Sequence, residues 1–193
     1  MAAQGKHKDA LVRTAAELFR KQGYAATGLN EIIAVSGAPK GSLYHYFPQG
    51  KVEIGAAAVR LAGVVGEATL QSLAEAYPDA EDFILAYGTR LAERLEGSDF
   101  REGCPIATTL LELAPAELEI TAAGRDALFS WAEVISRLLA SLGCEPLRAS
   151  RFGSFAVSAI EGALLQARVQ KSADPIKYAC AELATVFRAA CRP

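Results

Sequence analysis

Apolar residues recur along this chain at the three- and four-residue spacing of helices and almost nowhere alternate as they do in strands. In residues 7–22, Leu11, Ala15 and Phe19 fall on one face of a predicted amphipathic helix. Gly23 follows and supplies a stop, because glycine readily ends a helix in a left-handed conformation. The chain therefore begins with a predicted helix of about four turns.

Two shorter helices are predicted next. Leu29 and Ile32 mark the first of them, and a four-residue break at 36–39 separates it from a second helix at about 40–46. Pro48 then disfavours helix at the residue before it. Two short helices joined by a tight turn, after a longer one, are typical of a helix-turn-helix.

A long alanine-rich helix is predicted from Lys51 to about Tyr77, followed by further helices separated by glycine and proline. The expected breaks are Pro78, Gly97, Gly103-Cys104-Pro105, Pro115, residues 143–146 and Asp174-Pro175. The predicted fold class is all-α, with a three-helix helix-turn-helix domain at residues 1–51 and a larger helical domain at 52–193. The helix-turn-helix itself spans about 28–47.

The third predicted helix has an unusual composition for a buried element. Leu43 and Phe47 lie one turn apart and can anchor it on the first two helices, which leaves its polar residues facing outward. Donors and flat polar rings suit a recognition helix in the major groove of DNA. Charge agrees with this interpretation, since residues 1–51 carry seven basic and three acidic groups, while the remainder has a net charge of −6.

The predicted helix-turn-helix domain, residues 1–51, is called the head below. It closely resembles the DNA-binding domain of TetR-family regulators. The matching residues are Gly23, Tyr24, Thr27, Leu29 and Ile32, then Gly37 and the run from Lys40 to Phe47. The resemblance implies base contacts from Lys40, Gly41, Ser42 and Tyr44. It implies phosphate contacts from Thr27, His45, Tyr46 and Lys51.

The resemblance has departures, and some residues have a second interpretation. Pro39 stands where the family usually has a capping serine, although proline is acceptable at a first helical position. Gln49-Gly50 adds one residue before Lys51 relative to the commonest pattern. His45 as a core residue and Tyr44 as packing against the first helix are the alternatives to DNA contact.

A second motif, Gly103-Cys104-Pro105-Ile106-Ala107 followed by Leu111-Glu112, resembles the LmrA/YxaF-like branch of the family. That branch implies a small hydrophobic effector, with flavonoids among the candidates. Apolar side chains of residues 52–193, called the body below, are the candidates to line the pocket for this effector. These are Phe83, Tyr87, Cys104, Leu111, Phe129, Trp131 and Phe155. A redox-sensing Cys104 is the alternative to a structural or pocket-lining one.

The last two predicted helices, 146–170 and 175–191, are rich in small and apolar residues. The resemblance implies that they pair across a two-fold axis to form a homodimer, which suits a palindromic DNA site. The alternative is that one of them packs wholly inside the monomer.

The resemblance implies a ligand-responsive DNA-binding regulator, most often a repressor, and the protein is expected to act in the cytoplasm. The alternative is an activator or architectural DNA-binding protein without an effector. An enzyme is not expected, because the body lacks histidine and the chain has no P-loop, GxSxG or strand-linked GxGxxG motif. No cofactor, metal site or membrane span is expected, and the four scattered cysteines are expected to be reduced thiols.

Overall fold

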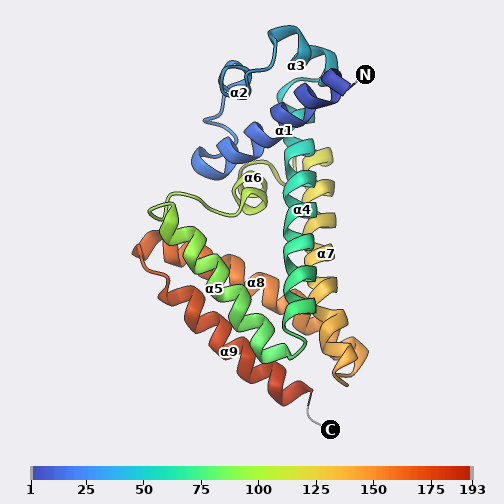
Figure 1. Ribbon diagram of the computed structural model, residues 1–193, viewed down its shortest axis with the longest axis vertical. Helices are drawn as coiled ribbons and strands as arrows, with labels where there is room; N and C mark the ends of the chain where they lie inside the picture. The colour runs from blue at the N-terminus through green and yellow to red at the C-terminus, as the bar shows by residue number, and fades with distance from the viewer. Residues whose placement is uncertain (1, 192–193) are drawn as a thin grey trace. The chain divides into compact units, whose positions relative to one another are not determined.

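A computed structural model describes residues 2–191, of which 5–191 have described side chains. This part of the chain is helical and contains no strand, which confirms the predicted all-α class (Figure 1). In chain order the helices are α1 (Ala2–Gln22), α2 (Leu29–Ser36), α3 (Lys40–Tyr46), α4 (Lys51–Ala76), α5 (Ala80–Gly97), α6 (Pro105–Leu113), α7 (Leu118–Ser141), α8 (Pro146–Gln170) and α9 (Asp174–Ala190).

The chain forms two compact units. The first comprises residues up to Val64 together with Cys104–Ala127. In it, α1 packs against α2, α3 and α6. The core side chains are fully buried at Leu11, Phe19 and Ile32, the apolar positions from which the first two helices were predicted. The amphipathic pattern therefore identified the inward face of this unit correctly.

Two left-handed glycines shape the turns of the head. Gly23 ends α1 with φ +85°, and Gly37 ends α2 with φ +66°. Backbone in this region strains other residues because of their Cβ, so glycine belongs at both positions. Pro39 precedes α3 as its N-cap, with ψ 140°, instead of forming the first helical residue. Its ring has no cap oxygen, and no side-chain hydrogen bond caps this helix.

The second unit comprises Val65–Gly103 and the chain from Leu128 onward. Here α9 packs against α5 and α8. Glycine permits the close approach at Gly88 on α5, where a Cβ would lie 2.6 Å from Sγ of Cys180 on α9. At Gly153 on α8 a Cβ would collide with the carbonyl oxygen of Ala132 on α7.

The compact units differ from a simple division at residue 51. Helices α4 and α7 each contribute residues to both units, and α6 lies in the same unit as α1, α2 and α3. The predicted domains were residues 1–51 and 52–193, whereas the packing groups α6 with α1. Residues 104–127, which belong to the predicted C-terminal domain, are therefore in the same compact unit as the head.

Candidate nucleic-acid interface and interior cavity

Helix α3 is held to the head by two side chains and exposes the rest of its surface. Leu43 is 0% exposed and Phe47 is 2% exposed. Tyr44 is 51% exposed, so it does not pack into the first helix. Lys40, Gly41 and His45 are also exposed, while Ser42 and Tyr46 are half-buried.

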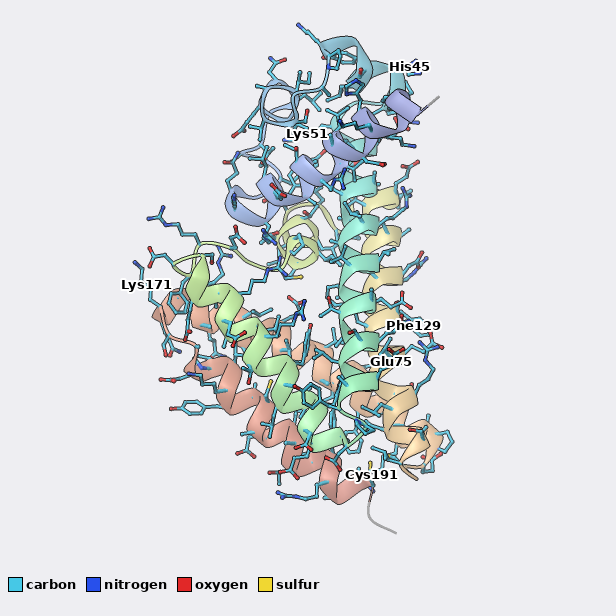
Figure 2. All side chains as sticks on the ribbon, viewed as in Figure 1. His45, Lys51, Glu75, Phe129, Lys171 and Cys191 are labelled. Atoms are coloured by element: carbon cyan, nitrogen blue, oxygen red, sulfur yellow. The ribbon has the colours of Figure 1, made fainter. Side chains whose placement is uncertain are left out.

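The aromatic and basic side chains around α3 contact one another. The rings of His45 and Tyr46 meet edge to face, with centroids 4.9 Å apart. Lys8 of α1 places Nζ 6.0 Å from the ring centroid of Phe47. Figure 2 shows His45 at the α3 end of the head and Lys51 at the start of α4. The candidate surface therefore carries imidazole, phenol and ammonium groups on neighbouring elements.

Thr27 differs from the other predicted DNA contacts because its side chain is fully buried. Its hydroxyl donates to the carbonyl oxygen of Gly23 at 2.7 Å, and Gln22 Nε2 donates to that hydroxyl at 3.3 Å. In this conformation Thr27 has no exposed surface for a phosphate. Its observed role is to close the turn that follows α1.

Lys51 lies beside the same turn. Its ammonium donates to the carbonyl oxygen of Ala25 at 3.3 Å and lies 4.3 Å from the ring centroid of Tyr24. Burial lowers the pKa of Lys51, and the nearby carboxylate of Glu112 opposes that shift. A cation held against a carbonyl and an aromatic face is oriented rather than freely mobile.

Glu112 of α6 completes this cluster, although the sequence analysis noted it only as part of a motif. Its carboxylate oxygens accept the backbone N–H groups of Tyr24, at 2.9 Å, and Ala25, at 2.6 Å. Nothing in the sequence pattern pairs residues 88 positions apart. The one feature of the sequence that could have singled out Glu112 is its place seven residues after Pro105, in the Gly-Cys-Pro motif at the start of α6.

The predicted effector-lining residues are divided between several environments. Tyr87 and Trp131 line a small, partly open cavity of about 10 Å³ in the second unit, together with Leu70, Ile135, Val157, Ile160 and Glu161. Phe83 is fully buried in the core. The exposed candidates are Leu111 (81%), Phe129 (69%) and Phe155 (53%). Figure 2 shows Phe129 on α7.

Cys104 has a structural position at the start of α6. Its Sγ accepts the backbone N–H of Ala107 at 3.5 Å, as an N-cap before Pro105. All four cysteines are free thiols. Burial raises the pKa of Cys180 to about 11.

Among residues 2–191, no group of three or more histidine, cysteine or carboxylate side chains is arranged to hold a metal ion. Within that same range, no helix combines the length and apolar character that crossing a bilayer requires.

Comparison with known families assigns both parts of the chain. Residues 11–58 match the family described as bacterial regulatory proteins, tetR family. Residues 80–182 match the C-terminal domain of transcriptional regulators that are LmrA/YxaF-like. Together these matches confirm the resemblances seen in the sequence.

Individual relatives agree along nearly the whole chain. The HTH-type transcriptional regulator YxaF of Bacillus subtilis is 30% identical over 97% of this chain and 98% of its own length. The regulator LmrA of the same organism is 31% identical, over 90% of this chain and 93% of its own.

Solved structures show the same fold. Reduced NemR of E. coli has a TM-score of 0.80 at 21% identity, covering 93% of this chain and 96% of its own. A TetR regulator of Chloroflexus aurantiacus has a TM-score of 0.78 at 27% identity, covering 97% of each chain. The matched families and sequence relatives are transcriptional regulators, not enzymes. This chain therefore belongs to the TetR family of bacterial transcriptional regulators, with an LmrA/YxaF-like C-terminal domain, and is a DNA-binding regulator.

Proposed function

We propose that this protein is a ligand-responsive repressor that binds a palindromic operator as a dimer in the cytoplasm and leaves it when a small hydrophobic effector binds. The observation that carries the proposal is the division of α3 into two faces. Leu43 and Phe47 are buried, while Lys40, Tyr44 and His45 are exposed. A short helix built in this way can enter a major groove without losing its anchors.

The proposed contacts are those that the resemblance to TetR-family regulators implies, and the donor groups on these residues support them. Lys40, Gly41, Ser42 and Tyr44 approach base edges, where ammonium, hydroxyl and phenol groups distinguish the base pairs. The ring groups of His45 and Tyr46 and the ammonium of Lys51 hold phosphates and so fix the register of the head. Thr27 contributes indirectly, by shaping the turn that carries Tyr24 and Ala25 beside Lys51.

The proposed dimer forms through α8 and α9. Phe155, Ala159, Gly162, Gln166 and Val169 follow one another on α8 at alternating intervals of four and three residues, the spacing of a helix–helix seam. Phe155 is 53% exposed and Val169 is 77% exposed. An exposed apolar face with small residues at its centre suits a second helix in close contact.

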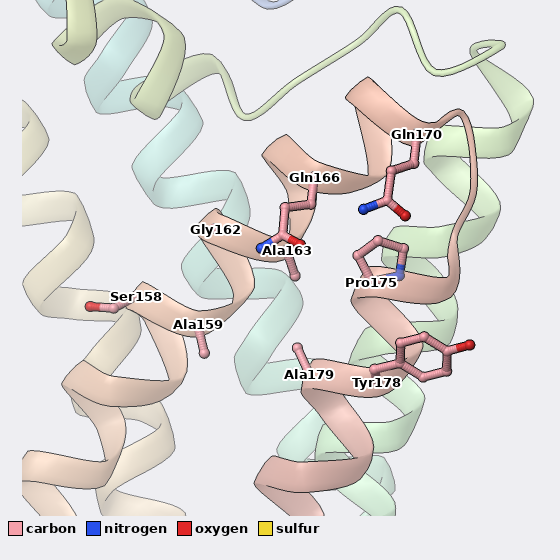
Figure 3. A pocket seen from close by; sticks show the side chains of 9 residues that line it. All are labelled: Ser158, Ala159, Gly162, Ala163, Gln166, Gln170, Pro175, Tyr178 and Ala179. Carbon is pink, nitrogen blue, oxygen red and sulfur yellow. The ribbon is translucent and has the colours of Figure 1, made fainter.

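A groove between α8 and α9 supports the proposal that these two helices form the dimer interface. It has a volume of about 430 Å³ and an open outer side (Figure 3). Its lining residues are Ser158, Ala159, Gly162, Ala163, Gln166, Gln170, Pro175, Tyr178 and Ala179. The occupant that we propose is the same pair of helices from a second copy, since identical patches pair across a two-fold axis. Two heads then read half-sites about 34–36 Å apart.

The cavity beside Tyr87 and Trp131 supports the effector proposal. At about 10 Å³ it has room for roughly one water molecule. A small hydrophobic effector therefore enters only when the surrounding side chains or helices move apart. Ligand binding is then coupled to a second conformation, and a ligand that prefers that conformation lowers operator affinity.

A gel shift on the DNA upstream of the gene tests DNA recognition. We expect the Lys40→Ala, Tyr44→Ala double variant to lose the shifted band while remaining a dimer by light scattering. The control is the Lys171→Ala, Tyr77→Ala double variant, which removes the same two residue types from exposed positions in the other unit. Full binding by the α3 variant would overturn the recognition surface.

Intrinsic fluorescence tests the effector site, because Trp131 is the single tryptophan of the chain and lines the cavity. A panel of small apolar compounds that includes a flavonoid is expected to contain a quencher that also releases the operator. Operator binding that is indifferent to every quenching compound would favour the alternative of an activator or architectural protein without an effector.

A further inference from the structure

Helix α6 approaches the end of α1 with two side chains one turn apart. The hydroxyl of Thr108 donates within α6 to the carbonyl oxygen of Cys104 at 2.9 Å and lies 3.4 Å from the carbonyl oxygen of Phe19. Four residues later, on the same face of α6, the Glu112 carboxylate accepts the N–H groups of Tyr24 and Ala25. These two bonds have lengths of 2.9 and 2.6 Å, as short as charge-assisted hydrogen bonds are.

The same two residues contact Lys51. The carbonyl oxygen of Ala25 accepts from Nζ of Lys51 at 3.3 Å, and the ring of Tyr24 lies under that ammonium at 4.3 Å. The N–H groups of this turn therefore bind Glu112, while a carbonyl oxygen and a ring of the same turn bind Lys51. Moving the turn would move the support of Lys51.

We propose that Glu112 is a positioning residue for DNA binding: by holding the Tyr24–Ala25 turn from α6, it places the Lys51 ammonium for a phosphate of the operator. The inference rests on the proposed function, in which Lys51 contacts DNA. It assigns to α6, a helix of the C-terminal sequence, direct control over one phosphate contact of each head.

Glycine at position 23 fits this arrangement. The carboxylate of Glu112 lies so close to Gly23 that a Cβ there would collide with Oε1. Gly23 also has φ +85°, so both the backbone conformation and the approach of the carboxylate require the absence of a side chain. The turn is therefore shaped to receive Glu112 as well as to end α1.

The sign of the electrostatic effect makes the proposal easy to test. A carboxylate near the DNA-binding surface repels phosphates, so its removal would by itself strengthen operator binding. The positioning role predicts weaker operator binding. Without the Glu112 carboxylate the Tyr24–Ala25 turn is no longer held, and the Lys51 ammonium no longer has a fixed position. Weaker binding after neutralisation of Glu112 would therefore be opposite in sign to the direct repulsion between its carboxylate and the phosphates.

The main variant is Glu112→Gln, which has the same size but lacks the charge and the second acceptor oxygen. We expect its operator affinity to fall about tenfold, or about 1.4 kcal/mol. The plot of log affinity against log salt should also become shallower by about two, one phosphate contact for each of two heads. Glu119→Gln is the matched control, since Glu119 is an exposed carboxylate in the first turn of α7 in the same unit.

A double-mutant cycle with Lys51→Gln separates positioning from general loosening of the head. If Glu112 acts through Lys51, the Glu112→Gln, Lys51→Gln double variant should bind as weakly as Lys51→Gln alone, with the same salt dependence. Additive losses, an unchanged salt slope in Glu112→Gln, or a gain in its affinity would each overturn the proposal.

Hydrogen exchange in the absence of DNA gives an independent measurement. The amides of Tyr24 and Ala25 should lose protection in Glu112→Gln and keep it in Glu119→Gln, and retained protection in Glu112→Gln would overturn the proposal. If the wild-type protein fails to bind its upstream DNA, the proposed function fails. The exchange result then still shows whether Glu112 holds the turn.

Discussion

Gly66 of α4 lies directly against the indole of Trp131 on α7, and a Cβ at Gly66 would stand 2.7 Å from Nε1 of that ring. Trp131 is 7% exposed and forms part of the cavity wall. The absence of one side chain on α4 therefore determines where a cavity-lining ring sits.

The first prediction follows from this contact. Gly66→Ala should lower the free energy of unfolding by about 1–2 kcal/mol, because overpacking against a rigid ring outweighs the gain in helix propensity. Urea unfolding measures it. Gly97→Ala is the control, since a Cβ there meets open space and should be neutral or stabilising. Equal stability of the two variants would contradict the contact.

The second prediction concerns the anchor of α3. Leu43 is fully buried, so Leu43→Ala should destabilise the head by about 2–4 kcal/mol through lost burial and a residual cavity. Tyr44→Ala, at the neighbouring exposed position, should change stability by less than about 0.5 kcal/mol. Thermal unfolding followed by circular dichroism compares them, and similar losses in both would argue against the two-faced helix.

The third prediction tests the dimer surface. A Cβ at Gly162 meets open space in the single chain, so Gly162→Arg should fold normally as a monomeric unit. In the proposed seam the same side chain would separate the two copies, and the variant should be monomeric by light scattering. Gly97→Arg, which also points into open space, should stay dimeric. A dimeric Gly162→Arg would place the interface elsewhere.

The fourth prediction concerns alkaline stability. Burial raises the pKa of Cys180 to about 11 from the ordinary value of 9.0, so the thiol resists ionisation more strongly in the folded state. Its contribution to stability is complete below pH 9 and is lost as the pH rises through 11. The expected loss is on the order of 2–3 kcal/mol.

Cys180→Ala isolates that contribution. The difference in unfolding free energy between this variant and the wild-type protein, measured in urea under reducing conditions, should change between pH 8 and pH 11. A difference that is constant across this range would show that Cys180 ionises as readily in the folded chain as in the unfolded one.

Local pattern was enough to predict most helices and their ends. The third helix was expected at about 40–46 and is found at Lys40–Tyr46, because Pro39 and Pro48 limit it on both sides. The inward positions Leu43 and Phe47 were also predicted correctly, since the spacing of apolar residues within one short helix records which face is buried.

Relationships between distant segments were not predictable in the same way. The burial of Thr27 depends on a hydrogen bond to Gly23 and on the local turn geometry, which residue types alone do not encode. The bond from Glu112 to the Tyr24 turn depends on how α6 packs against α1. Phe129 and Phe155 were candidates to line a pocket, yet both are exposed, because hydrophobicity does not say which side of a helix is covered.

The division of α3 into a buried face and an exposed face has an evolutionary consequence. Since Leu43 and Phe47 secure the helix and other positions face outward, substitutions at Lys40, Ser42 or Tyr44 should carry little penalty to folding, and under the proposed function they would alter the preferred DNA sequence. Under that proposal, a duplicated gene could acquire a new target sequence through a few codon changes while keeping its fold.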